Sequence, residues 1–251
     1  MKKKFTFTLT LKKLLFDLKK LKNAEKAKNY ARFFKTEKGE YGYGDKFLGI
    51  TVPDQRKIVK KYYQDISLKD VRLLLQSPFH EERLVALLAL VEKYKKANDE
   101  KKKEIFKLYF SNLHRVNNWD LVDVTCRDIV GAYLYDKNRK LLYRLAASKN
   151  LWKRRVAVIS TFYFIAKNDF QDSLKIAKLL LKDKHDLIHK AVGWMLREVG
   201  KRSLLAEKKF LDKHAAVMPR TMLRYAIEKF AEKERKSYLA RERLVKSLSF
   251  R

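Results

Sequence analysis

The chain has 251 residues, 46% of them hydrophobic, which is enough to bury a sizeable core and excludes wholesale disorder. It carries 60 lysines and arginines against 29 acidic residues, and this formal net charge of +31 favours a polyanionic partner. Cys126 is the single cysteine, which excludes a disulfide within the chain and a thiolate metal site.

The basic residues run through the whole chain and are not gathered on one amphipathic anchor, so nucleic acid is favoured over a membrane surface. The first residues are basic like the start of a signal peptide, but Lys12 and Lys13 interrupt the pattern and no small-residue cleavage site follows. The longest apolar run, residues 84–91, is too short to span a bilayer. We therefore expect a cytoplasmic protein without a membrane segment.

The elements predicted along the chain are almost entirely helices, rich in Leu, Lys, Ala, Arg and Glu. A glycine- and tyrosine-rich loop over residues 38–52 precedes Pro53, which is a good first helical residue, and Pro219 begins a later helix in the same way. Amphipathic helices are predicted near residues 141–148 and 170–181. No linker separates two parts, so we expect a single domain over residues 1–251.

An internal period also runs through the chain. Similar helical segments begin at Arg83, Arg155, Lys190 and Arg224; Arg155 lies 72 residues, twice 36, after Arg83, and the later gaps are 35 and 34. The missing member falls near Trp119. This spacing predicts an all-α fold, an α-solenoid of HEAT-like helical repeats. Such a stack is curved, and we expect these five positions to line a basic concave face that seats a DNA duplex.

The segment at residues 116–123 combines an aromatic residue with a carboxylate. Asn117 or Asn118 is a plausible N-cap, and Trp119 and Asp123, four residues apart, share a helix face that Arg127 continues. One interpretation is a core tryptophan beside an Asp123–Arg127 ion pair. The other is an aromatic surface and a carboxylate presented together at a DNA groove; spacing alone favours the first.

Two later segments carry basic and aromatic residues. Lys153, Arg154 and Arg155 fan around the first turns of a helix after Asn150, and they either contact phosphates or form a solvated charged turn. In the second segment, over residues 186–198, Gly193 costs helix stability and suggests close approach by a neighbour. Trp194 there is either core or a second aromatic wall.

Metal and nucleotide chemistry find little support in the sequence. His185 and His189 lie four residues apart, but no third ligand or His-Glu-x-x-His pattern accompanies them, so we expect no metal site. No phosphate-binding glycine loop or serine-nucleophile elbow is present, and we expect no cofactor.

Taken together in order and spacing, these segments resemble the DNA alkylation repair family of HEAT-like-repeat glycosylases, the AlkD type. The resemblance covers nearly the whole chain. Its most specific pieces are Asn118 to Asp123, Trp152 to Arg155 and Lys190 to Glu198, with further similarity at residues 25–27, 44–49 and 218–227.

The resemblance implies a hydrolase that removes N3- and N7-alkylated purines from duplex DNA by cleaving the N-glycosidic bond, without drawing the lesion into a deep pocket. It implies that Trp119, Asp123 and Trp194 form the catalytic site and that Arg155 holds a phosphate. Phe33 stands where the family places a tyrosine, so we expect an aromatic contact with DNA there without the hydroxyl contact. From the basic helix positions we add Lys153, Arg154, Lys190 and Arg224 as expected DNA contacts, and we expect a monomer.

Two alternatives stay open. A non-catalytic module of the same fold would bind branched or distorted DNA, which the charge and Phe33 favour. A HEAT-like scaffold for acidic protein partners would give no role to the tryptophans and the carboxylate.

Overall fold

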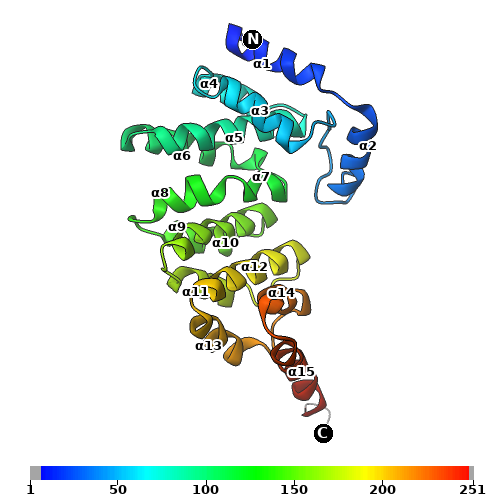
Figure 1. Cartoon of the computed structure of the whole chain (residues 1–251), viewed down its shortest axis with the longest axis vertical. Coiled ribbons are helices and arrows are strands. Elements are labelled where there is room, and N and C mark those ends of the chain that lie inside the picture. The colour runs from blue at the N-terminus through cyan, green and yellow to red at the C-terminus, as the bar shows by residue number, and fades with distance from the viewer. Residues whose placement is uncertain (1–6, 249–251) are drawn as a thin grey trace. The chain divides into compact units, whose positions relative to one another are not determined.

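The computed structural model describes residues 7–248, with side chains to residue 241 (Figure 1). Over this range the regular structure is helical and no β-strand forms; one isolated parallel bridge joins Lys46 to Phe79. The prediction of an all-α fold is therefore confirmed. The chain divides into two compact units, residues 1–129 and 130–251, each described here by itself. A single domain over residues 1–251 stays a prediction.

The first unit is built from seven α-helices and a short 3₁₀ turn within the described range. They are α1 (Leu9–Lys20), α2 (Ala24–Phe33), α3 (Val52–Tyr62), α4 (Leu68–Leu75), α5 (His80–Lys96), α6 (Asp99–Ser111), η1 (Leu113–Arg115) and α7 (Trp119–Asp123). A π-helical stretch, η2 (Cys126–Gly131), leads out of this unit.

The second unit continues in the same manner. Its elements are α8 (Ala132–Leu134), α9 (Lys140–Ala146), α10 (Leu151–Ala166), α11 (Gln171–Leu179), α12 (Asp186–Arg202), α13 (Leu204–His214), α14 (Arg220–Ala226), η3 (Ile227–Lys229) and α15 (Glu232–Leu248). The helices predicted near residues 141–148 and 170–181 are α9 and α11.

Within each unit, every second helix packs against the next of its kind. In the first unit α3, α5 and α7 are successive neighbours, while α4 packs against both α5 and α6. In the second unit α10, α12 and α14 are successive neighbours, and α9, α11 and α13 pack along them. This alternation is the packing of a helical repeat, and it places the five periodic residues on equivalent helices of the two units. The predicted basic concave face stays a prediction.

The predicted helix starts are largely confirmed. Asn118 caps α7 by accepting the Trp119 N–H at 2.8 Å, and Asn150 caps α10 by accepting the Lys153 N–H at 3.0 Å. The helix predicted to begin at Pro53 begins one residue earlier, because Thr51 caps it. The helix predicted to begin at Pro219 begins one residue later, at Arg220, with Pro219 at the N-cap.

A buried glutamate holds the glycine-rich loop against the first unit. The carboxylate of Glu81, on α5, accepts backbone N–H bonds from Leu48 at 2.9 Å, Gly49 at 2.8 Å and Ile50 at 3.3 Å. Gly49 has a φ of +79°, and a Cβ there would lie 2.0 Å from the Asn23 carbonyl oxygen. The loop can therefore pass this close to α2 only with glycine at position 49.

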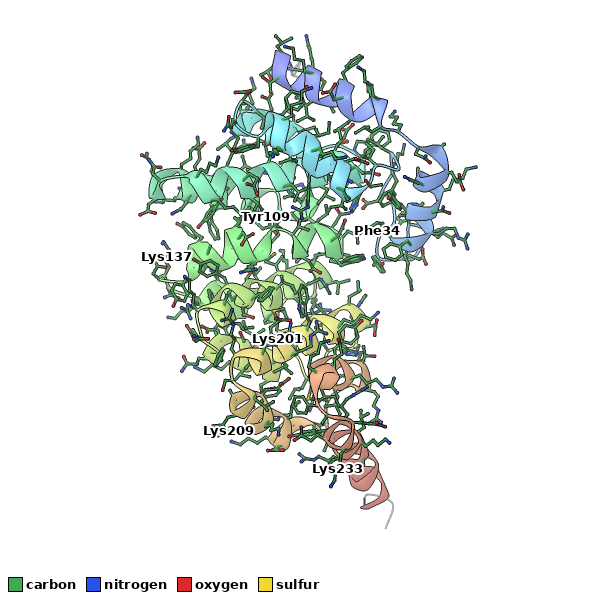
Figure 2. The ribbon with its side chains drawn as sticks, viewed as in Figure 1. Phe34, Tyr109, Lys137, Lys201, Lys209 and Lys233 are labelled. Atoms are coloured by element: carbon green, nitrogen blue, oxygen red, sulfur yellow. The ribbon has the colours of Figure 1, made fainter. Side chains whose placement is uncertain are left out.

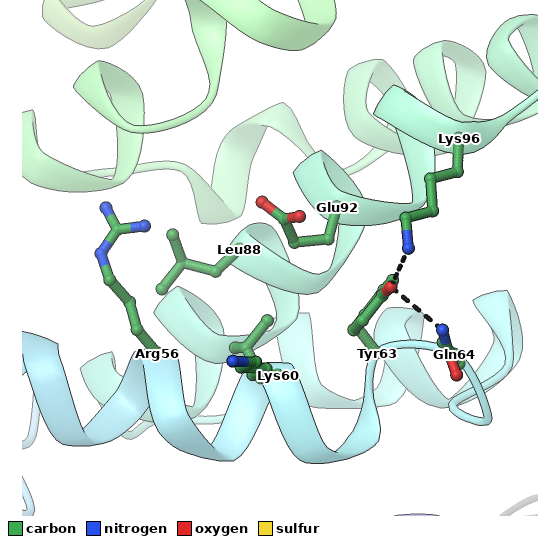
Figure 3. A pocket seen from close by; sticks show the side chains of 8 residues that line it. Arg56, Lys60, Tyr63, Gln64, Leu88, Glu92 and Lys96 are labelled. Atoms are coloured by element: carbon green, nitrogen blue, oxygen red, sulfur yellow. Dashed lines mark hydrogen bonds between the residues drawn. The ribbon is translucent and has the colours of Figure 1, made fainter.

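A shallow cavity of about 440 Å³ lies between α3 and α5 (Figure 3). At its edge the Tyr63 hydroxyl accepts a hydrogen bond from the Lys96 ammonium and another from the Gln64 amide nitrogen at 3.1 Å. The Lys96 bond lowers the pKa of Tyr63. These bonds tie the end of α3 to the end of α5, which explains the polar character of this edge.

The surface carries much of the positive charge. Exposed lysines of the second unit, such as Lys137, Lys201, Lys209 and Lys233, lie on different helices and turns (Figure 2). Over residues 7–248, no helix combines the length and the apolar character needed to cross a bilayer.

Gly193 lies where α12 meets α14, as its place in the middle of a helix suggested. A Cβ at this position would lie 2.4 Å from the Met222 carbonyl oxygen and 2.5 Å from the Tyr225 Cβ. Both are fixed parts of α14, so a methyl group forces the two helices apart.

We therefore expect Gly193→Ala to lower the free energy of unfolding by about 1–3 kcal/mol, although alanine is the better helix former. Chemical denaturation followed by circular dichroism measures this loss. Lys201→Ala, at an exposed position of the same helix, is the control. A loss at position 193 no greater than that of the control would contradict this account.

Candidate nucleic-acid site

The largest cavity described in the first unit, about 660 Å³, opens beside Trp119. Most of its wall is aromatic or aliphatic. Its lining is Asn29, Tyr30, Phe33, Phe34, Phe47, Ile50, Val52, Gln55, His80, Glu81, Leu84, Trp119, Asp120 and Val124. The cavity therefore collects side chains from α2, the glycine-rich loop, α3, α5 and the α7 region.

The aromatic rings of this cavity form a connected group. The Phe34 ring stacks on Trp119 with centroids 5.4 Å apart, and Phe33 meets the edge of Trp119 at 6.0 Å. Phe47 stacks on Phe34 at 5.2 Å. Phe34 lies just beyond the end of α2 (Figure 2). Phe33 is 63% exposed and forms the outer edge of the group, where an aromatic face is free to meet a ligand.

A charged network lies directly behind these rings. His80, 2% exposed, directs Nδ1 at Asp45 Oδ2, 3.2 Å away, and Nε2 at Asp120 Oδ2, 2.7 Å away. The guanidinium of Arg83 donates to Asp45 Oδ1 at 2.7 Å, and the Asn117 amide nitrogen donates to the same oxygen at 3.2 Å. Two cationic groups and two carboxylates thus balance one another in a nearly dry setting.

The protonation of this network follows from its geometry. Burial by itself lowers the pKa of His80, but the charge and hydrogen bond of Asp120, with the hydrogen bond of Asp45, outweigh it and raise the pKa to about 9. Burial likewise works to raise the pKa of Asp45, but the bonds and charges of His80 and Arg83 bring it below its usual value. At neutral pH the network therefore holds an imidazolium between two carboxylates.

Of the predicted catalytic residues, Trp119 and Asp123 lie on α7, one helical turn apart. Both side chains are partly exposed, so Trp119 is not the fully buried core tryptophan of the first interpretation. The carboxylate of α7 that lines the cavity is Asp120 and not Asp123. Arg127 lies beyond the end of α7, in the π-helical stretch η2.

The other predicted aromatic residue, Trp194, lies on α12 of the second unit and is partly exposed. Its indole nitrogen donates to Glu198 Oε1 at 3.2 Å, and its ring meets Phe162 edge-on at 5.7 Å. Trp194 thus belongs to the side of α12 away from the fully buried core positions.

Arg155 and Lys190 occupy the fifth position of α10 and α12. Arg155 is 5% exposed, and its guanidinium donates to the Leu187 carbonyl oxygen at 2.5 Å. Lys190 pairs with Asp186 one turn earlier at 2.8 Å. A phosphate contact by Arg155 stays a prediction.

The remaining predicted DNA contacts differ in exposure. Lys153 and Arg224 are exposed, whereas Arg154 pairs with Asp183 at 2.6 Å. One expectation of the repeat is wrong: Arg83 does not line an exposed face, because it is 1% exposed and also donates to the Ser77 carbonyl oxygen. The period places equivalent residues on equivalent helices, but Asp45, from outside the repeat pattern, draws Arg83 inward.

The histidine pair that we considered as a metal site has other roles. His185 accepts the Leu187 N–H at the start of α12, and His189 Nε2 bonds the Asp183 carbonyl oxygen at 2.5 Å. Within the part of the chain that the structure describes, no group of three or more His, Cys, Asp or Glu side chains is arranged to hold a metal ion.

Sequence reasoning missed Asp45, His80, Phe34 and Phe47 as parts of one site. Asp45 and Phe47 stand in the glycine-rich loop, which the sequence marked as a break between helices and, at residues 44–49, as a segment similar to the family. The one available signal was the presence of a charged and an aromatic residue among those glycines.

Comparison with known proteins places this arrangement in context. A solved structure, the predicted DNA alkylation repair enzyme from Enterococcus faecalis, superposes with a TM-score of 0.65 over 84% of this chain and 97% of that one, at 18% identity. At this identity the likeness shows a shared helical fold. No curated protein sequence matches the chain. The family model of the DNA alkylation repair enzymes matches residues 14–230, so the chain belongs to that family.

Proposed function

We propose that this protein is a DNA glycosylase that hydrolyses the N-glycosidic bond of cationic N3- or N7-alkylated purines in duplex DNA. The observation that carries the proposal is the aromatic cavity that Trp119 lines. The Asp123 carboxylate lies one turn further along the same short helix. Membership in a DNA alkylation repair family and the net charge of +31 support DNA as the partner.

Hydrolysis of this N-glycosidic bond needs little help from a general acid. A purine alkylated at N3 or N7 is already positively charged, so the electron pair of the glycosidic bond leaves with a good leaving group. Positive charge then develops on the deoxyribose, and a nearby carboxylate lowers the energy of that state. In our proposal Asp123 supplies this charge and orients the water whose oxygen bonds C1′, and the released proton passes to solvent.

The aromatic residues have a matching role. The faces of Trp119 and Phe33 attract a cationic centre and exclude water around the sugar. We further propose, from the family resemblance, that Trp194 offers a second aromatic face to the DNA. In the same proposal Arg155 contacts a phosphate, and basic side chains such as Lys153 contact the DNA backbone. The lesion then needs no base-reading pocket, and selection rests on its charge and on the weakened duplex.

The direct test is base release from duplex DNA containing 7-methylguanine, measured by chromatography of the free base. We expect release by the protein that grows with time and leaves an alkali-labile abasic site, and no release of unmodified guanine. A hydrolase of this mechanism remains active in the presence of a chelator.

The second candidate is a non-catalytic module for distorted DNA, favoured by Phe33, which lacks the hydroxyl implied by the family pattern. It predicts binding whose log affinity falls steeply with log salt concentration, with no released base. Tight, salt-sensitive binding to a lesion duplex without any free 7-methylguanine would replace our proposal with this one.

A further inference from the structure

A charged network lies next to the aromatic cavity. Three segments far apart in sequence meet there: the glycine-rich loop with Asp45, the first turn of α5 with His80 and Arg83, and the first turn of α7 with Asp120. The side chain of His80 is the link between the other two, because each of its nitrogens meets a different carboxylate. It is also in contact with the rings of Phe34 and Phe47, whose centroids both lie 4.9 Å from its own.

The helix that this network holds is unusually short. α7 spans five residues, from Trp119 to Asp123, and the backbone leaves it for a turn and then the π-helical stretch η2. Helices of this length are not stable by themselves, so contacts from neighbouring elements fix its orientation. The Asp120–His80 bond, at 2.7 Å, is the charged contact between α7 and α5.

We propose that His80 is a positioning residue, which through Asp120 holds α7 so that Trp119 and Asp123 present their side chains in the geometry needed for catalysis. This inference rests on the proposed function for its catalytic consequence, but the positioning itself is measurable without turnover. His80 touches neither substrate nor reacting atoms in this account; it acts through Asp120.

Because His80 is charged, the strength with which it holds α7 depends on pH. The groups that face it are Asp45 from the loop, Asp120 from α7 and Arg83 from its own helix, while Arg115 lies beyond Arg83 and bonds the Ser77 carbonyl oxygen at 2.7 Å. The folded-state pKa of about 9 lies above the ordinary 6.5, so the stabilisation is complete below pH 6.5 and is lost as the pH rises through about 9.

The sharpest variant is Asp120→Asn. Its side-chain oxygen still accepts the hydrogen bond from His80, so the shape of the contact survives while the opposite charge disappears. The pKa of His80 must then fall. The pH at which His80 stops holding α7 in position must therefore be lower than in the unaltered protein. We expect single-turnover base release at pH 7.5 to fall by about 10- to 100-fold, since small misplacements of catalytic groups have effects of this size.

Two readouts test the proposal together. Protein labelled with 5-fluorotryptophan gives a resonance for Trp119, assigned with Trp119→Phe, and we expect it to titrate with a midpoint near 9 in the unaltered protein. In Asp120→Asn the midpoint of the Trp119 titration moves toward neutral pH. The pH above which base release declines moves in the same direction. Ring opening of 7-methylguanine at high pH affects both proteins alike, so it does not produce this difference.

Two further variants keep the test decisive. His80→Asn removes the cation between two carboxylates, and we expect loss of the Trp119 titration. His114→Asn is the matched control, an exposed histidine of the same unit, and it leaves the titration unchanged. A Trp119 resonance that does not titrate near 9, or a midpoint unmoved by Asp120→Asn, overturns the inference even where base release is found. Absence of base release with the expected titration overturns only the proposed function.

Discussion

Replacing Asp123 by asparagine is expected to reduce base release from a 7-methylguanine duplex on the order of 10²–10³-fold, the size typical of losing one preorganised electrostatic contact. The amide keeps the size of the carboxylate and a polar oxygen but loses the negative charge that stabilises the cationic sugar. Binding to the same duplex is expected to stay equal or to become slightly tighter, because a carboxylate that faces DNA repels phosphates.

The measurement is a single-turnover time course at saturating protein, with affinity measured separately by fluorescence anisotropy. Asp99→Asn is the matched control, since Asp99 lies exposed on α6 of the same unit. Unchanged release by Asp123→Asn would remove Asp123 from the mechanism. If Asp120→Asn then caused the larger loss of base release, Asp120 would become the charge-stabilising group.

Replacing Glu81 by alanine is expected to lower the free energy of unfolding by about 3–5 kcal/mol, the largest stability effect that we foresee. The Glu81 carboxylate is 1% exposed and accepts the N–H groups of Leu48, Gly49 and Ile50. Without it, three backbone donors remain in the interior without an acceptor, and the loop that carries Asp45 and Phe47 loses its anchor.

Urea denaturation followed by circular dichroism measures this loss, and hydrogen exchange of residues 48–50 locates it. Glu81→Gln keeps one acceptor oxygen and is expected to lose about half as much, while Glu100→Ala on the exposed side of α6 is a matched control with little effect. A loss below 1 kcal/mol for Glu81→Ala would show that water replaces the carboxylate.

Several features of this protein could be predicted from local sequence alone. The helices, their asparagine caps and the approach of a neighbour at Gly193 depend on short-range patterns: periodic apolar residues, side chains that accept a nearby N–H, and a missing Cβ. The repeat period placed Arg155 and Lys190 at the same position of successive equivalent helices, because packing of repeats depends on regular spacing.

The burial of particular charges was decided only by the tertiary structure. Arg83 fits the repeat pattern as an exposed basic residue, yet Asp45, which lies 38 residues earlier, pairs with it in the interior. A partner this far away in the sequence cannot be recognised from the residue pattern around either side chain. The pairing of Asp120 with His80 at the cavity wall, which distinguishes it from Asp123, likewise depends on how α5 and α7 pack.

From the residues alone we predicted the all-helical fold, the basic character and a shared helix face for Trp119 and Asp123. Only the tertiary structure joined α2, the glycine-rich loop, α5 and α7 into one aromatic cavity with a charged network behind it. The physical reason is that helix formation depends on neighbours within a few residues, whereas desolvation of a charge depends on whatever the fold brings around it.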